Sequence, residues 1–186
     1  MKRLFDIIFS ILGSALLILP MSVIFLIIKA TSPGPGLFWS DRFGKDRQLF
    51  KMPKFRSMKK DTPIVATHIL QDPKSFYTPF GLFLRKTSLD ELPQLWSILI
   101  GDMSFVGPRP ALMNQYDLIE LRENKDVNML KPGLTGWAQI NGRDALSIEE
   151  KVIYDEEYMK KSSIMFDILI MIRTIVKTVK ETNISH

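Results

Sequence analysis

The chain contains no cysteine and only two histidines, His68 and His186, among its 186 residues. The absence of cysteine excludes disulfides, a thiolate metal site and a cysteine nucleophile. The two histidines are far apart in the chain, which argues against a histidine metal cluster or a Ser-His-Asp triad. Acid–base or metal chemistry must therefore come mainly from carboxylates.

Several nucleotide-binding and nucleic-acid-binding signatures are also missing. The sequence has neither a Walker A nor a G-x-G-x-x-G pattern, which excludes the P-loop and Rossmann classes. It has no D-x-D triplet, which weakens an ordinary metal-dependent glycosyltransferase. Zinc-finger spacing, RNP-like aromatic motifs and heptads are absent too, so no nucleic-acid partner is expected. The length fits one domain with a real core.

Residues 7–28 form a run of 22 uncharged and mostly apolar residues. As a helix this run would be about 33 Å long, enough to cross the hydrocarbon core. Pro20 interrupts it, and positive charge stands on both sides, at Lys2, Arg3 and Lys29. Both flanks thus favour the cytoplasmic side. Two topologies are open: a kinked span, or a re-entrant helix broken at Leu19-Pro20 whose freed backbone is satisfied by Ser14, Ser22 or underlying protein.

Positive charge is concentrated after this run. Residues 29–60 contain nine Lys or Arg against two Asp, a net charge of +7 compared with +5 for the whole chain. Such a block indicates binding to an anionic membrane surface or to a phosphate-bearing ligand.

The rest of the pattern predicts an α+β fold, predominantly helical with a small β-hairpin. Apolar runs around Arg42–Asp46 predict the hairpin, and residues 61–79 are expected to be mostly loop. Helices are expected around 80–86, 89–100, 111–123 and 147–161. An amphipathic helix over 163–181 would lie in the membrane interface or pack on the core.

Two adjacent carboxylates, Asp90 and Glu91, can be interpreted in two ways. Ser88 and Glu91 have the spacing of a capping box, in which case Asp90 would only complement the helix dipole. The alternative is that the pair performs chemistry. Two Gly- and Pro-rich segments, 101–110 and 131–139, resemble anion-binding loops as well as rigid turns; Arg109 lies between two prolines in the first.

Three long blocks resemble the bacterial sugar transferase family, the monotopic polyprenyl-phosphate phosphoglycosyl transferases. They are SPGPGLFWSDRFGKDRQLFKMPKFRSMK, RKTSLDELPQLWSILIGDMSFVGPRP and LKPGLTGWAQINGRD, in this order over nearly the whole chain. The chain resembles the short form of the family, without the extra N-terminal multi-helix region, and within it the capsule-type enzymes for N-acetylated deoxy-amino sugars. Where family members have Ser-Pro at the helix break, this chain has Leu19-Pro20.

The resemblance implies a reaction and its location. A phosphosugar would pass from a UDP-sugar to undecaprenyl phosphate with release of UMP, at the cytoplasmic face of the bacterial inner membrane. Residues 1–31 would be the membrane-embedded re-entrant helix, and residues 32–186 the catalytic domain with interfacial amphipathic helices. Membrane lipids and a second copy of the chain, in a homodimer, would be partners.

The resemblance also implies roles for individual residues. Asp90 would be the nucleophile that carries the phosphosugar, and Asp90 and Glu91 would bind the required Mg²⁺. Arg85 would clamp phosphate or hold the pair. The expected substrate-binding residues are Lys54, Arg56, Arg109 and Arg143. The rival hypotheses are a non-catalytic membrane adaptor and a metal-dependent glycosyltransferase that releases UDP.

Overall fold

The computed structural model describes residues 1–63 and 72–184. His68, His186 and the middle of the expected 61–79 loop lie outside them. The helices are α1 Lys2–Thr31, α2 Gly81–Lys86, α3 Leu95–Ile100, α4 Tyr116–Glu123, α5 Trp137–Ile140, α6 Ile148–Lys161 and α7 Ile164–Ile184. The strands are β1 Leu37–Phe43, β2 Leu49–Phe55, β3 Ser104–Val106, β4 Ala111–Leu112 and β5 Gly133–Thr135. Short 3₁₀ helices lie at Lys45–Arg47, Pro73–Phe76, Leu89–Gln94, Val127–Met129 and Arg143–Ala145.

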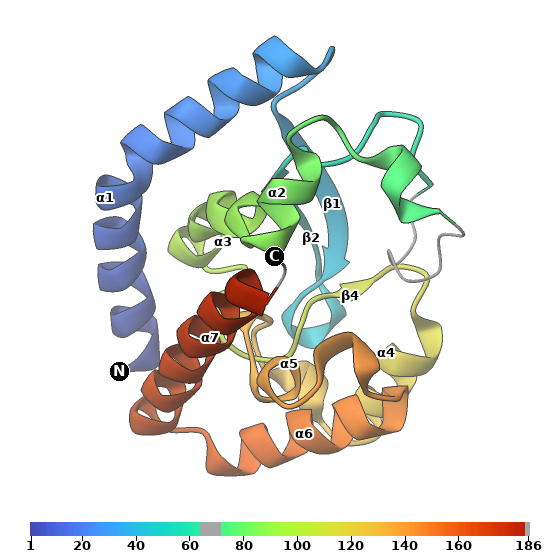
Figure 1. Cartoon of the computed structure of the whole chain (residues 1–186). Coiled ribbons are helices and arrows are strands. Elements are labelled where there is room, and N and C mark those ends of the chain that lie inside the picture. The colour runs from blue at the N-terminus through green and yellow to red at the C-terminus, as the bar shows by residue number, and fades with distance from the viewer. Residues whose placement is uncertain (64–71, 185–186) are drawn as a thin grey trace.

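The long helix α1 runs along one side of the molecule and bends partway along its length (Figure 1). It continues through Pro20 as one helix, so the break expected at Leu19-Pro20 is wrong and the helix bends instead. Proline removes one helical hydrogen bond and pushes its ring against the preceding turn, which is a common cause of such bends. The hydroxyl of Ser22 donates to the carbonyl of Ile18 at 2.7 Å, which gives a carbonyl near the bend an additional partner.

The middle of α1 is exposed, whereas both ends are attached to the globular part. Leu16 and Leu19 are 79% and 73% exposed. Near the N-terminal end, buried Asp6 accepts hydrogen bonds from the Ser104 hydroxyl and the Phe105 amide, both at 3.1 Å. At the other end, Ile28 is buried in a cluster. The apolar surface of α1 is therefore exposed around its bend, where the rest of the protein does not cover it.

Two further side chains, Arg3 and Lys2, fix the first turn of α1. Arg3 donates to the carbonyls of Ile98 and Leu99 at 2.5 and 2.6 Å. Lys2 forms an ion pair with Asp167 of α7 at 2.5 Å. The two carbonyls that accept from Arg3 belong to the last turn of α3, where a positive charge is favoured.

The predicted hairpin is confirmed. Strands β1 and β2 pair antiparallel, from Leu37 opposite Phe55 to Phe43 opposite Leu49. Strand β4 adds to the other edge of β1, and β3 pairs in parallel with β5. The hairpin places Lys54, near the end of β2, against the 3₁₀ helix at Leu89–Gln94.

Two of the expected helices differ in the structure. The segment 89–100 is a 3₁₀ helix followed by α3, because Pro93 has no N–H to continue an α-helical ladder. The helix expected from 111 begins only at Tyr116, since Ala111 and Leu112 pair with β1 instead. The expected helices at 80–86 and 147–161 are present as α2 and α6.

Helix α7 packs on the core along one side, as one of the two expectations had it; its location in the membrane interface stays a prediction. Asp167 and Ile170 are 2% and 0% exposed, so one side packs on the core. Met165, Ile172 and Ile175 are exposed, so an apolar strip remains on another side.

Candidate active site

The capping-box interpretation of Ser88 and Glu91 is wrong. Ser88 adopts a left-handed backbone conformation, φ 57°, and its side chain makes no cap hydrogen bond. Such a conformation is uncommon outside glycine and is worth examining for function. The side chain of Glu91 turns away from the helix start and toward the hairpin. The pair of carboxylates is therefore not a simple helix cap.

Glu91 lies between two cations that come from distant parts of the chain. Its Oε1 atom is 2.7 Å from Lys54 Nζ and 3.4 Å from Arg109 Nη2. Burial alone would raise the pKa of Glu91, but the charges of Lys54 and Arg109 and the Lys54 hydrogen bond hold it well below its usual range. Burial also lowers the pKa of Lys54, despite the opposing effect of Glu91. Glu91 is therefore ionised at neutral pH.

Asp90 is almost buried, with 5% of the residue exposed. Burial raises the pKa of its carboxyl above the ordinary value, although the nearby charges of Lys54 and Arg85 oppose the shift. The pKa values of the two neighbouring carboxyls are thus shifted in opposite directions. Such separation is typical of sites where one group reacts and the other stays charged.

The other two predicted arginines of this region have structural partners. Arg85 donates from Nε to the Ser57 hydroxyl at 3.1 Å, and its charge acts on Asp90. Arg56 is buried and donates to the carbonyls of Ser32 and Pro33, both at 2.8 Å. A Cβ on Gly34, whose φ is +117°, would overlap the Arg56 guanidinium. Arg56 thus holds the loop after α1 and is not placed beside Glu91.

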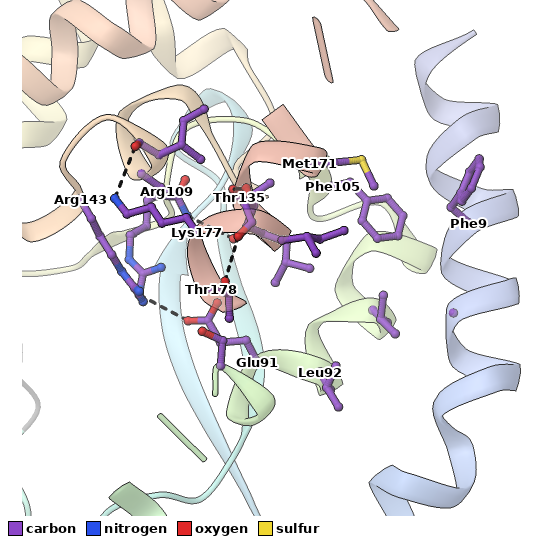
Figure 2. A pocket seen from close by; sticks show the side chains of 18 of the residues that line it. Phe9, Glu91, Leu92, Phe105, Arg109, Thr135, Arg143, Met171, Lys177 and Thr178 are labelled. Carbon is purple, nitrogen blue, oxygen red and sulfur yellow. Dashed lines mark hydrogen bonds and ion pairs between the residues drawn. The ribbon is translucent and has the colours of Figure 1, made fainter. Parts of the chain in front are cut away.

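A cavity of about 370 Å³ opens between α1, α3 and α7. One end is polar: Glu91, Arg109, Arg143 and Lys177 line it, and Lys177 donates to the Ile140 carbonyl at 3.4 Å (Figure 2). The other end is apolar and extends to α1. Its lining includes Phe9, Leu17, Leu92, Leu95, Phe105, Met171 and Ile175. Ser88 and Glu91 line the cavity, whereas their neighbour Asp90 is not among its lining residues.

The structure adds residues to the site that the sequence did not single out. Lys177, Thr174 and Thr178 come from α7 and Thr135 from β5. Arg42 of β1 lies close enough to Arg109 and Glu91 for their charges to act on it, and burial is the main reason that its pKa falls to about 10. A helical pattern in the sequence indicated α7 but could not show that its polar positions face Glu91.

The carboxylates fit a magnesium ion that is bound together with substrate. Among residues 1–63 and 72–184, no group of three His, Asp or Glu side chains is arranged to hold a metal. Magnesium commonly uses one or two carboxylates, with water and substrate phosphates completing its shell. Lys54 and Arg109 both contact Oε1 of Glu91. Asp90 and Glu91 would hold the ion.

The sequence is similar to those of known sugar transferases. A sequence profile described as bacterial sugar transferase matches residues 1–181. The chain is 41% identical to the UDP-glucose:undecaprenyl-phosphate glucose-1-phosphate transferase of Escherichia coli (strain K12), covering 95% of this chain and 40% of that protein. It is 36% identical to the galactosyl transferase CpsE of Streptococcus agalactiae serotype III (94% and 41% covered).

The name of a third relative includes an amino sugar. It is the UDP-N-acetylgalactosamine-undecaprenyl-phosphate N-acetylgalactosaminephosphotransferase of Aeromonas hydrophila, 35% identical over 94% of this chain and 42% of that protein. The chain thus spans about two fifths of the length of these relatives.

Proposed function

Since this chain belongs to the bacterial sugar transferase family, we propose that it transfers a sugar phosphate from a UDP-sugar to undecaprenyl phosphate, through a covalent intermediate on Asp90. The observation that carries the proposal is the two-ended cavity. A cationic end around Glu91 suits a diphosphate, and an apolar end against α1 suits a prenyl chain. Charged and apolar substrates would therefore meet at one place.

The proposed chemistry has two steps. A carboxylate oxygen of Asp90 attacks the sugar-bearing phosphorus of the UDP-sugar, and the bond from that phosphorus to the bridging oxygen of UMP breaks. A phosphate oxygen of undecaprenyl phosphate then attacks the same phosphorus, which forms the diphosphate and releases the Asp90 carboxylate. Dividing the reaction in this way lets a soluble donor and a lipid acceptor use one nucleophile in turn.

The surrounding charges favour this chemistry. An anionic nucleophile can approach an anionic phosphorus only where cations reduce the repulsion. Arg109, Arg143 and Lys54 supply fixed positive charge near Glu91, and Arg85 acts on Asp90. Mg²⁺, when bound by Asp90, Glu91 and the substrate phosphates, would neutralise further charge on the diphosphate.

The nucleotide product tests the proposal. Purified protein mixed with UDP-sugar, undecaprenyl phosphate and Mg²⁺ is expected to release UMP, and chelation by EDTA is expected to stop the release until Mg²⁺ is added back. Chromatography separates UMP from UDP. Release of UDP would reject the proposal. A panel of UDP-sugars identifies the donor; UDP-N-acetylated deoxy-amino sugars are tested first, with UDP-glucose and UDP-galactose beside them.

We further propose that α1 is re-entrant and that the globular part lies on the cytoplasmic face of the inner membrane. By length and composition α1 is able to cross a membrane. Its first turns, however, are bound to β3, α3 and α7. Its last turns pack in a hydrophobic cluster with Phe55 of β2 and Leu84 of α2. Both ends attach to one globular body, while Leu16 and Leu19 between them remain exposed. A homodimer stays a prediction.

Labelling of single cysteines tests this topology, because the natural chain has none to interfere. A cysteine added before Met1 and another from Thr31→Cys are both expected to react with an impermeant maleimide only in inside-out vesicles. Leu19→Cys, at the bend, is expected to stay unlabelled on both sides. An Asp117→Cys control reports the side of the globular part. Labelling before Met1 from the periplasmic side would establish a spanning helix instead.

A further inference from the structure

The short loop Gly107–Pro110, which carries Arg109, is held through its backbone. Three consecutive carbonyls each accept a hydrogen bond from a different element. Pro108 accepts from the Gly133 amide at 2.8 Å, Arg109 from Arg122 Nη1 at 2.8 Å and Pro110 from Arg42 Nη1 at 3.1 Å. The Gly107 amide also donates to Thr135 at 2.9 Å. Little freedom remains in the backbone from which Arg109 reaches Glu91.

The second of these donors belongs to a buried ion pair. Arg122 of α4 donates from Nε and Nη2 to Oδ2 of Asp155 on α6, at 3.0 and 2.7 Å. The two side chains are only 8% and 2% exposed. Arg122 thus connects a carboxylate on α6 to the backbone of the residue that contacts Glu91.

A stabilising role alone does not account well for this pair. Buried ion pairs seldom add stability compared with an apolar pair of the same shape, because both charges lose their hydration. Burial raises the pKa of Asp155 against the effect of Arg122, in line with that cost. A planar guanidinium, on the other hand, can fix two groups at once through its fork of donors.

We propose that Arg122 and Asp155 are positioning residues that orient Arg109 toward the diphosphate of the UDP-sugar. Neither lines the cavity, and in Figure 1 α4 and α6 lie at the far end of the molecule from the bend of α1. Asp155 sets the plane of Arg122, Arg122 holds the Arg109 carbonyl, and the flanking prolines pass this restraint to the Arg109 side chain. The inference rests on the proposed function, in which Arg109 contacts that diphosphate.

Conservative variants test this role. Asp155→Asn and Arg122→Lys are expected to raise both the Kd for UDP and the KM for UDP-sugar by on the order of ten- to a hundredfold, because a displacement of about 1 Å at a binding group has effects of this size. The KM for undecaprenyl phosphate is expected to change less than about twofold. Glu123→Gln and Glu156→Gln, the chain neighbours in exposed or partly exposed ion pairs, are matched controls that should behave as wild type.

A double-mutant cycle separates positioning from a structural role. In an Arg109→Ala background, Asp155→Asn is expected to cause no further loss of UDP affinity, because its effect passes through the missing side chain. Thermal unfolding is followed in parallel, and Asp155→Asn is the variant of choice if Arg122→Lys does not fold. Unchanged UDP affinity in a destabilised variant, or losses that add in the Arg109→Ala background, would overturn the inference.

The same measurements keep the two proposals apart. UDP affinity is measured by calorimetry without turnover. A wild-type protein that binds UDP but releases no UMP contradicts the proposed function alone. Variants that bind UDP as well as wild type contradict the positioning role alone, and a wild-type protein that binds no UDP contradicts both.

Discussion

Asp90→Asn is expected to reduce UMP release by more than about a thousandfold, because losing a covalent nucleophile leaves only the binding contribution of the site. The asparagine amide has nearly the same shape but is not a comparable nucleophile toward phosphorus. Intact mass spectrometry of wild-type protein incubated with UDP-sugar alone should show a phosphosugar adduct, and the variant should show none. The exposed Asp117→Asn variant serves as the control. Full activity of Asp90→Asn would remove the basis of the mechanism.

The same variant is expected to be at least as stable as wild type. The pKa of Asp90 is raised in the folded protein. The ionised carboxylate therefore costs stability above that pKa, and the cost disappears as pH falls below the ordinary carboxyl range. Asparagine removes the cost at neutral pH, whereas at acidic pH the two proteins should be similar. Thermal melting at pH 7 and pH 4 measures this, and shows that lost activity does not result from unfolding.

Lys54→Met is expected to lower the free energy of unfolding by on the order of 3 kcal/mol, because it removes the closer of the two ion-pair partners that buried Glu91 has among the described residues and leaves the half-exposed Arg109. Glu91→Gln added to Lys54→Met should recover most of that stability, since no uncompensated charge remains. Activity should not recover, because the site loses a cation and a proposed magnesium ligand. Denaturant unfolding and UMP release are measured for the single and double variants.

The pH dependence of the Lys54→Met effect follows from Glu91. In wild type the pKa of Glu91 is depressed, so its contribution to stability is present above the ordinary carboxyl range and is lost only on strong acidification. Without Lys54, burial prevails and this pKa rises. The variant should therefore be more destabilised at pH 7 than at pH 4. Lys51→Met, on the same strand but exposed, should change little at either pH. An equal loss at both pH values would contradict this account.

Local patterns in the sequence were sufficient for much of the fold. The 7–28 run predicted α1, two β-rich runs around Arg42–Asp46 predicted the hairpin, and the blocks around Asp90 indicated the family. These features depend on neighbours in the chain, such as proline, turn residues and hydrophobic periodicity. The same local logic failed at Ser88, where the spacing matched a capping box but Glu91 pairs with Lys54 and Arg109 from distant parts of the chain.

By itself, then, the sequence determined the apolar helix with its proline, the hairpin and the adjacent carboxylates, because each follows from residues close together in the chain. Only the tertiary structure decided which cations serve the site. It brought Lys54 and Arg109 to Glu91, directed Arg56 to the loop after α1, and placed Lys177 of α7 on the cavity wall. These contacts depend on packing between segments far apart in the chain. The packing determines which cation lies within hydrogen-bonding distance of a buried carboxylate.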